Sequence, residues 1–295
     1  MLHYSGTPIA ALRLDMKRVE KPWGRRSLPP PFAGGSASAG PVGEIWFELP
    51  GRQLDLMVKY IFTSEKLSIH VHPSDEEARL AGHRQGKEEC WYILDAAPGA
   101  SVGIGTTRPL TDAELADACQ SGAIEDLMEW LPVRTGDLFY IPAGTVHAIG
   151  VGISLVQIQQ NADIAYRLYD YGRPRELHLD RGVAVSRACP YPPAMRCHVS
   201  TETPDLLVDG PKFRLALTHG AIPVLEGRGP YYIVPLQGVV ATDDGVARAG
   251  ECVVTGDRSR IMPLGEVRML VARSCAGGGS HLTREKIGNF GKGME

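Results

Sequence analysis

Short runs rich in β-branched and aromatic residues, each bounded by glycine, proline or aspartate, recur along most of this 295-residue chain. Such runs are typical of β-strands. The 34 glycines and 22 prolines fit many tight turns better than a helical bundle. The pattern therefore predicts a mainly β protein. The strand-like runs are Gly43–Leu49, Leu56–Phe62, Leu67–Val71, Glu89–Leu94, Ser101–Ile104, Asp137–Ile141, Ser154–Gln159, Phe213–Thr218, Tyr231–Pro235, Val239–Ala241, Val246–Arg248, Cys252–Val254 and Val267–Ala272.

One helical passage, at about residues 107–131, interrupts the strands. Thr111 and Glu114 have the spacing of a capping box, and apolar residues then recur at helical intervals. We expect two short helices, separated at Ser121-Gly122.

The character of the chain changes after about Asp180, and the proline-rich, aperiodic stretch Ala188–Pro204 is interpreted as a linker or an extended crossing segment. Strand-like runs then return, and Asp243-Asp244-Gly245 predicts a hairpin turn. We therefore predict two tandem β-barrels, residues 1–187 with the helical insertion and residues 188–275, followed by a flexible tail at 276–295.

The composition excludes several classes of protein. A net charge of −3 without a basic stripe argues against nucleic-acid binding. The sequence has no run of 18 apolar residues of the kind that spans a membrane. Met1–Met16 lacks the pattern of a secretory signal, so we expect a cytoplasmic protein. The six cysteines show no CxxC spacing and are interpreted as reduced thiols.

The sharpest local feature is the pair His70 and His72, two residues apart in a strand-like run. The period of two in a strand places both imidazoles on the same face, where Ser68 also points, and this favours a pocket role for that serine. Two converging imidazoles are a common beginning of a Zn, Fe, Mn or Ni site.

A third histidine follows in Gly136–His147, where a strand ends at Pro142 and a glycine-containing turn leads to a new strand presenting His147. Glu89, on an intervening strand, can add a carboxylate. Three imidazoles and one carboxylate leave room on a first-row metal for water or substrate oxygens, as a catalytic site requires.

The segment Gly136–His147 matches the second cupin motif, G(x)5PxG(x)2H, at every defined position. From Lys21 to Arg181 the chain resembles the short bacterial form of type I mannose-6-phosphate isomerase, a zinc-dependent cupin. The segments that carry the resemblance are KPWG at Lys21–Gly24, GEIW at Gly43–Trp46, LSIHVHP at Leu67–Pro73, GKEECWYIL at Gly86–Leu94, FYIPAGTVHAIG at Phe139–Gly150 and QIQQNADIAYRLYDYGRPREL at Gln157–Leu177.

The resemblance implies cupin (jelly-roll) barrels and one divalent metal, Zn²⁺, per chain. It also implies an aldose–ketose isomerase that interconverts mannose 6-phosphate and fructose 6-phosphate through an enediol(ate). The partner would be a small-molecule sugar phosphate, and the protein a monomer or homodimer. The family's metal-ligand positions fall on His70, His72, Glu89 and His147.

The family's active-site lysine falls on Lys87 and its active-site arginine on Arg167. The resemblance thus implies that both residues are catalytic and bind the substrate, and the strand alternation adds Ser68 as a substrate-binding candidate. Positive charge there would stabilise developing oxyanions or hold the phosphate, and arginine is better suited to a bidentate grip.

Two positions depart from the family. His70 stands where the family often has Gln or Lys, and Gln157 stands where many members carry a glutamate proposed to act in proton transfer. An amide cannot serve as a general base. Alternatives are therefore a non-catalytic or altered-specificity cupin that binds a sugar or sugar phosphate and, less favoured, an Fe(II) cupin oxygenase.

The second half resembles a degenerate cupin barrel. Where the second cupin motif would require Pro, Gly and His, it has Gly256, Arg258 and Ile261, and no HxH precedes them. We expect this half to hold no metal.

Overall fold

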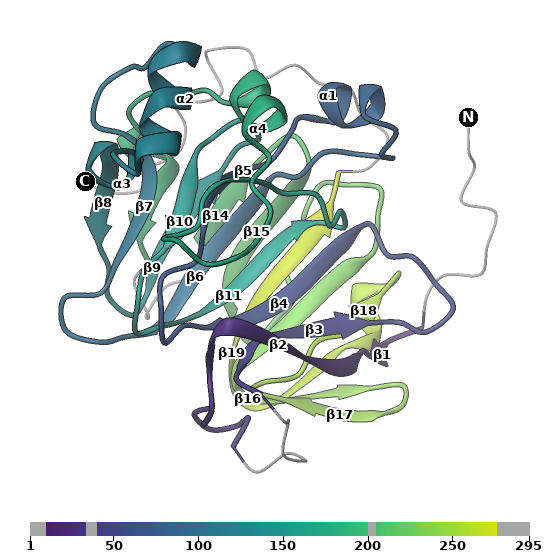
Figure 1. Cartoon of the computed structure of the whole chain (residues 1–295). Coiled ribbons are helices and arrows are strands. Elements are labelled where there is room, and N and C mark those ends of the chain that lie inside the picture. The colour runs from purple at the N-terminus through teal and green to yellow at the C-terminus, as the bar shows by residue number, and fades with distance from the viewer. Residues whose placement is uncertain (1–9, 34–39, 200–204, 276–295) are drawn as a thin grey trace.

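The computed structural model describes residues 10–33, 40–199 and 205–275. Three antiparallel β-sheets dominate it, with the helices gathered at one end (Figure 1). The central sheet has the order β13-β9-β6-β11-β4-β3-β2. Its strands are β2 (Asp15–Arg25), β3 (Val42–Glu48), β4 (Leu56–Phe62), β6 (Glu89–Ala96), β9 (Asp137–Ile141), β11 (Ile153–Gln160) and β13 (Arg196–His198).

A five-stranded sheet, in the order β12-β5-β10-β7-β8, faces one side of the central sheet. Its strands are β5 (Ile69–Val71), β7 (Ser101–Thr106), β8 (Met128–Pro132), β10 (His147–Ile149) and β12 (Tyr166–Tyr169). Helices α2 and α4 and the short α3 pack on its outer face. The helices are α1 (Asp75–Leu80), α2 (Asp112–Ser121), α3 (Ile124–Leu127) and α4 (Leu179–Val185).

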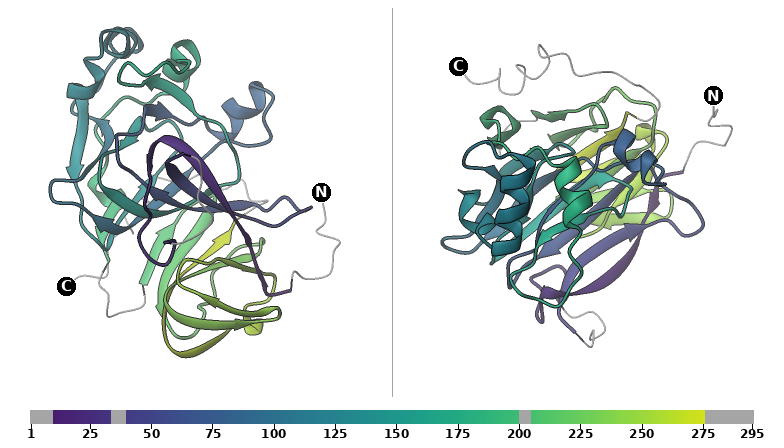
Figure 2. Two further views of the ribbon diagram at one scale, coloured as in Figure 1. Left: turned by 60° about the horizontal axis from the view of Figure 1, so that its bottom comes forward. Right: turned by 45° about the horizontal axis from the view of Figure 1, so that its top comes forward.

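The third sheet comes almost entirely from the second half of the chain and has the order β1-β18-β16-β19-β15-β14, with β17 beside β16. Figure 2 shows it as a separate group of green and yellow strands. Its strands are β1 (Leu12–Arg13), β14 (Asp205–Asp209), β15 (Phe213–His219), β16 (Tyr231–Thr242), β17 (Gly245–Arg248), β18 (Val253–Thr255) and β19 (Met262–Ser274).

The two tandem cupin (jelly-roll) barrels expected from the sequence are not confirmed. The chain is mainly β, but its described strands form three sheets, none of which closes on itself. The strands of the first half separate into two facing sheets, and the N-terminal β1 crosses to pair with β18 in the third. Closure depends on such long-range pairing, which local strand patterns do not specify. The expected tail, 276–295, lies outside the described residues.

The passage around residues 107–131 contains α2, which begins after the capping box of Thr111 and Glu114 and ends at Gly122. Gly122 has φ +83°, a left-handed conformation that suits glycine. The short α3 follows, and residues from Met128 form strand β8 rather than more helix because they pair with β7.

The central sheet is covered on both faces. Alternate residues such as Tyr60, Cys90 and Ile158 pack against the third sheet. Residues of the opposite parity, such as Ile61 and Trp91, pack toward the five-stranded sheet. The second half therefore supports the central sheet from behind, and the space between the other two sheets is where the predicted site residues meet. None of the helices within the described ranges combines the length and apolarity needed to cross a membrane.

Candidate metal centre

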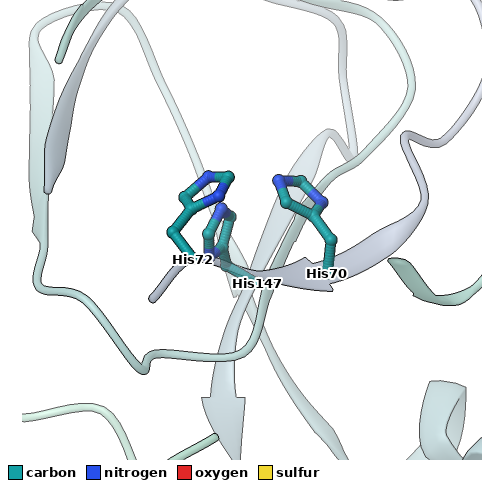
Figure 3. Close-up of side chains that lie close together, drawn as sticks. All are labelled: His70, His72 and His147. Atoms are coloured by element: carbon teal, nitrogen blue, oxygen red, sulfur yellow. The ribbon is translucent and has the colours of Figure 1, made fainter. Parts of the chain in front are cut away.

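Three imidazoles converge between the two facing sheets. His70 on β5 lies directly opposite His147 on β10, and His72 comes directly after β5, two residues on from His70. Their ligand nitrogens all lie within 4.8 Å of one another. Figure 3 shows the three rings directed toward a common region. The shared face expected from the strand period is therefore what brings these side chains together.

The Nδ1 atom of each histidine fixes the orientation of its ring through a hydrogen bond to the backbone. Nδ1 of His70, His72 and His147 lies 2.7–2.8 Å from the backbone carbonyls of Ser68, Ile164 and Thr145, respectively. A carbonyl oxygen only accepts, so each Nδ1 carries the hydrogen and each Nε2 keeps its lone pair. A carbonyl partner of this kind is typical of histidines that bind metals.

The inner nitrogens are the observation that favours a metal. Nε2 of His72 and Nε2 of His147 are buried, and neither has a hydrogen-bond partner among the described residues. Buried polar atoms are rarely left unpaired, because each one costs about 1–3 kcal/mol. Two such lone pairs beside a third imidazole have the donor chemistry that a divalent cation satisfies.

Glu89, the first residue of β6, adds an anionic group. Its carboxylate oxygens lie 3.4 Å from His72 Nε2 and 3.5 Å from His147 Nε2. The side chain is almost fully buried and is held by Trp91 Nε1, Gln157 Nε2 and Lys87 Nζ, at 2.9, 2.9 and 3.0 Å. These donors fix the orientation of the carboxylate without occupying the imidazole nitrogens.

The electrostatics keep the cluster in the protonation states that a metal requires. Burial lowers the pKa of His72 and of His147 to about 3 each, and it lowers the pKa of His70 well below its usual value. Burial alone would raise the pKa of Glu89, but Lys87, His72 and His147 together outweigh it and the pKa falls well below its usual range. At neutral pH the set is three neutral imidazoles and one carboxylate.

A pocket opens beside this cluster. His70, His72 and Glu89 are among its lining residues, as are the predicted Ser68, Lys87 and Arg167. His147 is fully buried. All seven residues predicted from the sequence therefore lie in or next to one site.

Lys87 and Arg167 reach the pocket from opposite sheets. Lys87 is buried just before β6, whereas Arg167 on β12 lies directly opposite His70 and therefore projects from the same face. Arg167 Nε is buried without a hydrogen-bond partner among the described residues, while another nitrogen of the same guanidinium donates to Glu176 O. Burial and the nearby Arg175 lower the pKa of Arg167.

The structure adds charged residues that sequence reasoning missed. Lys59 on β4 and Glu44 on β3 form a buried ion pair, with 3.2 Å between Nζ and Oε2 and side chains 5% and 10% exposed. Lys21 Nζ lies 3.5 Å from the other oxygen of Glu44, and Trp46 Nε1 also donates to this carboxylate. Burial lowers the pKa of Lys59, and Glu44 partly opposes this shift.

Counting these residues, five cationic side chains and three carboxylates line the pocket. The side chains alone give the pocket an excess of positive charge, without any metal, so the pocket favours an anionic ligand. The cations are Lys21, Lys59, Lys87, Arg167 and Arg175, and the carboxylates are Glu44, Glu89 and Asp163.

Gln157 lies at the centre of the pocket wall, between Trp91 on β6 and Lys59 on β4. Gln159 Nε2 donates to two carbonyls, those of Gln160 and Ala162, so its Oε1 must face Gln157. The group facing that oxygen must then be the Gln157 amide nitrogen, which lies at 2.6 Å and also donates to Glu89. In this chain Gln157 is a neutral donor to the carboxylate.

No model of a known protein family matches the chain. Over 145 residues the chain is 41% identical to the mannose-6-phosphate isomerase ManA of Bacillus subtilis (strain 168), a match that covers 47% of this chain and 46% of that protein. The chain spans about half the length of the curated relatives it matches.

Solved structures extend the likeness over more of the fold. The mannose 6-phosphate isomerase from Bacillus subtilis superposes with a TM-score of 0.73 at 24% identity, covering 89% of this chain and 99% of that one. A zinc-bound mannose 6-phosphate isomerase superposes with a TM-score of 0.67 at 14% identity, covering 90% and 99%. The resemblance inferred from the motifs is confirmed: the chain is homologous to mannose-6-phosphate isomerases over about half its length and has their fold over most of it.

Proposed function

We propose that this chain is a metal-dependent aldose–ketose isomerase that interconverts mannose 6-phosphate and fructose 6-phosphate. The observation that carries the proposal is the pair of buried, unpartnered Nε2 atoms of His72 and His147, which stand beside Glu89 next to a cationic pocket. The names of the relatives and of the superposed structures supply the substrate class.

The metal would be zinc, one ion per chain, held by His70, His72, Glu89 and His147. Zinc accepts this set of nitrogen and oxygen donors, and one of the superposed structures is described as zinc-bound. When bound, the ion supplies Lewis acidity that stabilises the negative charge of an enediol(ate). The second half of the chain is proposed to hold no metal.

The cations of the pocket would bind and orient the anionic sugar. Arg167, with one buried nitrogen unpartnered among the described residues, is suited to grip a phosphate or an oxyanion. Lys87 places a buried ammonium group 3.0 Å from Glu89, where it would stabilise negative charge that develops on the sugar. Ser68 lines the same pocket, and its hydroxyl would donate a hydrogen bond to the substrate.

The proton that moves between C1 and C2 needs a carrier other than Gln157. Lys59 lies directly opposite Gln157 in the sheet, is buried in the pocket wall, and has a lowered pKa. A lysine whose pKa is lowered by burial has more of its neutral, basic form near neutral pH. We assign the transfer to Lys59, with Glu44 orienting its amine.

A second candidate function is binding of a sugar phosphate without conversion, and Gln157 is the observation that favours it. Its amide is committed to Glu89 and Gln159 and carries no proton to the substrate. The buried lysine beside it favours catalysis instead. An Fe(II) oxygenase uses a similar donor set, but the charged pocket wall and the named relatives give it no support.

The direct test is turnover. Zinc-loaded protein is incubated with mannose 6-phosphate, and fructose 6-phosphate is detected by a coupled assay, with His147→Ala as the control. Turnover above the control supports the isomerase. Tight binding of either sugar phosphate without turnover would instead establish the binding protein.

The remaining sequence predictions stay proposals. We divide the chain at residues 187 and 188, supported by the gathering of β14–β19 in the third sheet, where β1 is the one strand from the first half. A monomer or homodimer and a cytoplasmic location are predictions from the sequence.

A further inference from the structure

A lysine from the second half of the chain contacts the helix that follows the metal-binding strand. Lys212 lies in the turn between β14 and β15, and its Nζ is 2.7 Å from Asp75 Oδ2. Asp75 begins α1, three residues after His72. This ion pair therefore connects the third sheet to the edge of the proposed active site.

The other oxygen of Asp75 holds two groups. Its Oδ1 accepts a hydrogen bond from the backbone nitrogen of Gly86, at 2.9 Å, and one from Gln160 Nε2, at 3.0 Å. Burial would raise the pKa of Asp75, but the bonds from Lys212, Gln160 and Gly86 lower it below its usual value. The carboxylate is therefore charged at neutral pH and accepts hydrogen bonds from three parts of the chain, with the exposed Arg79 of α1 3.6 Å from Oδ2.

These bonds fix the segment that carries Lys87 and leads directly into Glu89. Gln160 Oε1 accepts from the backbone nitrogen of Glu88, and the nitrogen of Lys87 donates to Pro73 O, both at 3.0 Å. Three consecutive amides, at residues 86–88, are thus tied to Asp75, Pro73 and Gln160. The packing is close, since a Cβ on Gly86 would lie 2.3 Å from Pro73 O.

We propose that Lys212 is a positioning residue for the active site. It holds the carboxylate of Asp75, which in turn holds the segment 86–88, so that the Lys87 side chain and the Glu89 carboxylate keep their places at the metal centre. The second half of the chain then contributes to the site without touching the substrate. The consequence for turnover rests on the proposed isomerase function, but the positioning itself does not.

The experiment compares Lys212→Met, which removes the charge and keeps the apolar stem, with Lys212→Arg, which restores a cation of similar reach. The matched control is Arg260→Met, which breaks another 2.7 Å ion pair of the second half, with Asp243, that has no link to the pocket. Hydrogen–deuterium exchange is followed in the peptide spanning residues 83–94, and zinc affinity is measured by competition with a chromophoric chelator.

We expect Lys212→Met to speed exchange in this peptide and to weaken zinc binding by about tenfold, the lower end of the effect of outer-shell partners. Lys212→Arg should recover both, and Arg260→Met should change neither. Asp75→Asn, which keeps an oxygen for Gly86 but loses the charge facing Lys212, should reproduce the Lys212→Met result.

Wild-type exchange and zinc affinity in Lys212→Met would overturn the proposal, and so would equal changes in Arg260→Met. Because neither readout requires turnover, failure here is distinguishable from failure of the isomerase assay.

Discussion

The buried histidines make the metal-free protein sensitive to acid, and His72 gives a measurable case. Its pKa is about 3 in the folded protein, against an ordinary value of 6.5, because burial disfavours the charged ring. At pH 8 the ring is neutral in both states and contributes nothing. Between pH 6.5 and about 3 the unfolded chain binds a proton that the folded chain does not, so stability falls as the pH drops.

The size of the effect follows from the shift. At pH 5, about 1.5 pH units below the unfolded pKa, a single histidine of this kind costs about 2 kcal/mol of unfolding free energy, at roughly 1.4 kcal/mol per unit. His72→Gln removes the titrating ring but keeps a neutral donor for the Ile164 carbonyl. Glu89 and His147 interact with His72, but burial acts on both groups in the two proteins alike, so most of the difference between the proteins comes from His72.

The assay is urea unfolding of chelator-treated wild type and His72→Gln at pH 8 and at pH 5. The wild type should lose about 2 kcal/mol more than the variant between the two pH values. Equal losses in wild type and His72→Gln would refute the reasoning, because they would show that the ring is not held neutral by burial.

Three further predictions concern the proton carrier and its surroundings. Lys59→Met should lower kcat by about 100-fold or more, as expected for loss of a general base, while equilibrium titration still detects binding of the sugar phosphate; an unchanged kcat would contradict the role of Lys59. Glu44→Gln should lower the free energy of unfolding in urea by about 3 kcal/mol, because it leaves the buried Lys59 without its anion. The same change should move the rising limb of the pH–kcat profile to lower pH, and a shift to higher pH would contradict the pairing of Glu44 with Lys59. Gln157→Glu should move that limb to higher pH, since a new carboxylate beside Lys59 raises the lysine pKa, and an unshifted limb would indicate another base.

Local patterns sufficed where a strand's own residues determine its pairing. The bounds expected for β4 and β9 agree with the structure, because both are compact apolar runs with clear turn residues at their ends. β2 was missed because its composition is charged and it lies at the edge of its sheet, where one side is exposed. The proline-rich stretch interpreted as a linker contains β13, whose exposed side chains carry no strand pattern and whose backbone pairs with β9.

The site residues that local patterns predict are likewise distinct from those that depend on tertiary packing. The strand period and the turn before His147 placed the imidazoles, because these relations are local. Lys59 and Glu44 were missed because each is a charged residue in an otherwise apolar strand. Only the packing of two sheets against each other shows that these side chains face a pocket. The signal in the sequence that could have identified them was a charged residue in the middle of an otherwise apolar strand.

The central claim is that this pocket moves a proton between C1 and C2 of a sugar phosphate with the help of a metal. The most direct test is to incubate the zinc-loaded protein with fructose 6-phosphate in D₂O and to follow deuterium incorporation at carbon by NMR. We predict mannose 6-phosphate as product, with deuterium from solvent at C2, and neither product nor label with His147→Ala. Binding of the sugar phosphate with no product and no exchange at C1 or C2 would contradict the claim.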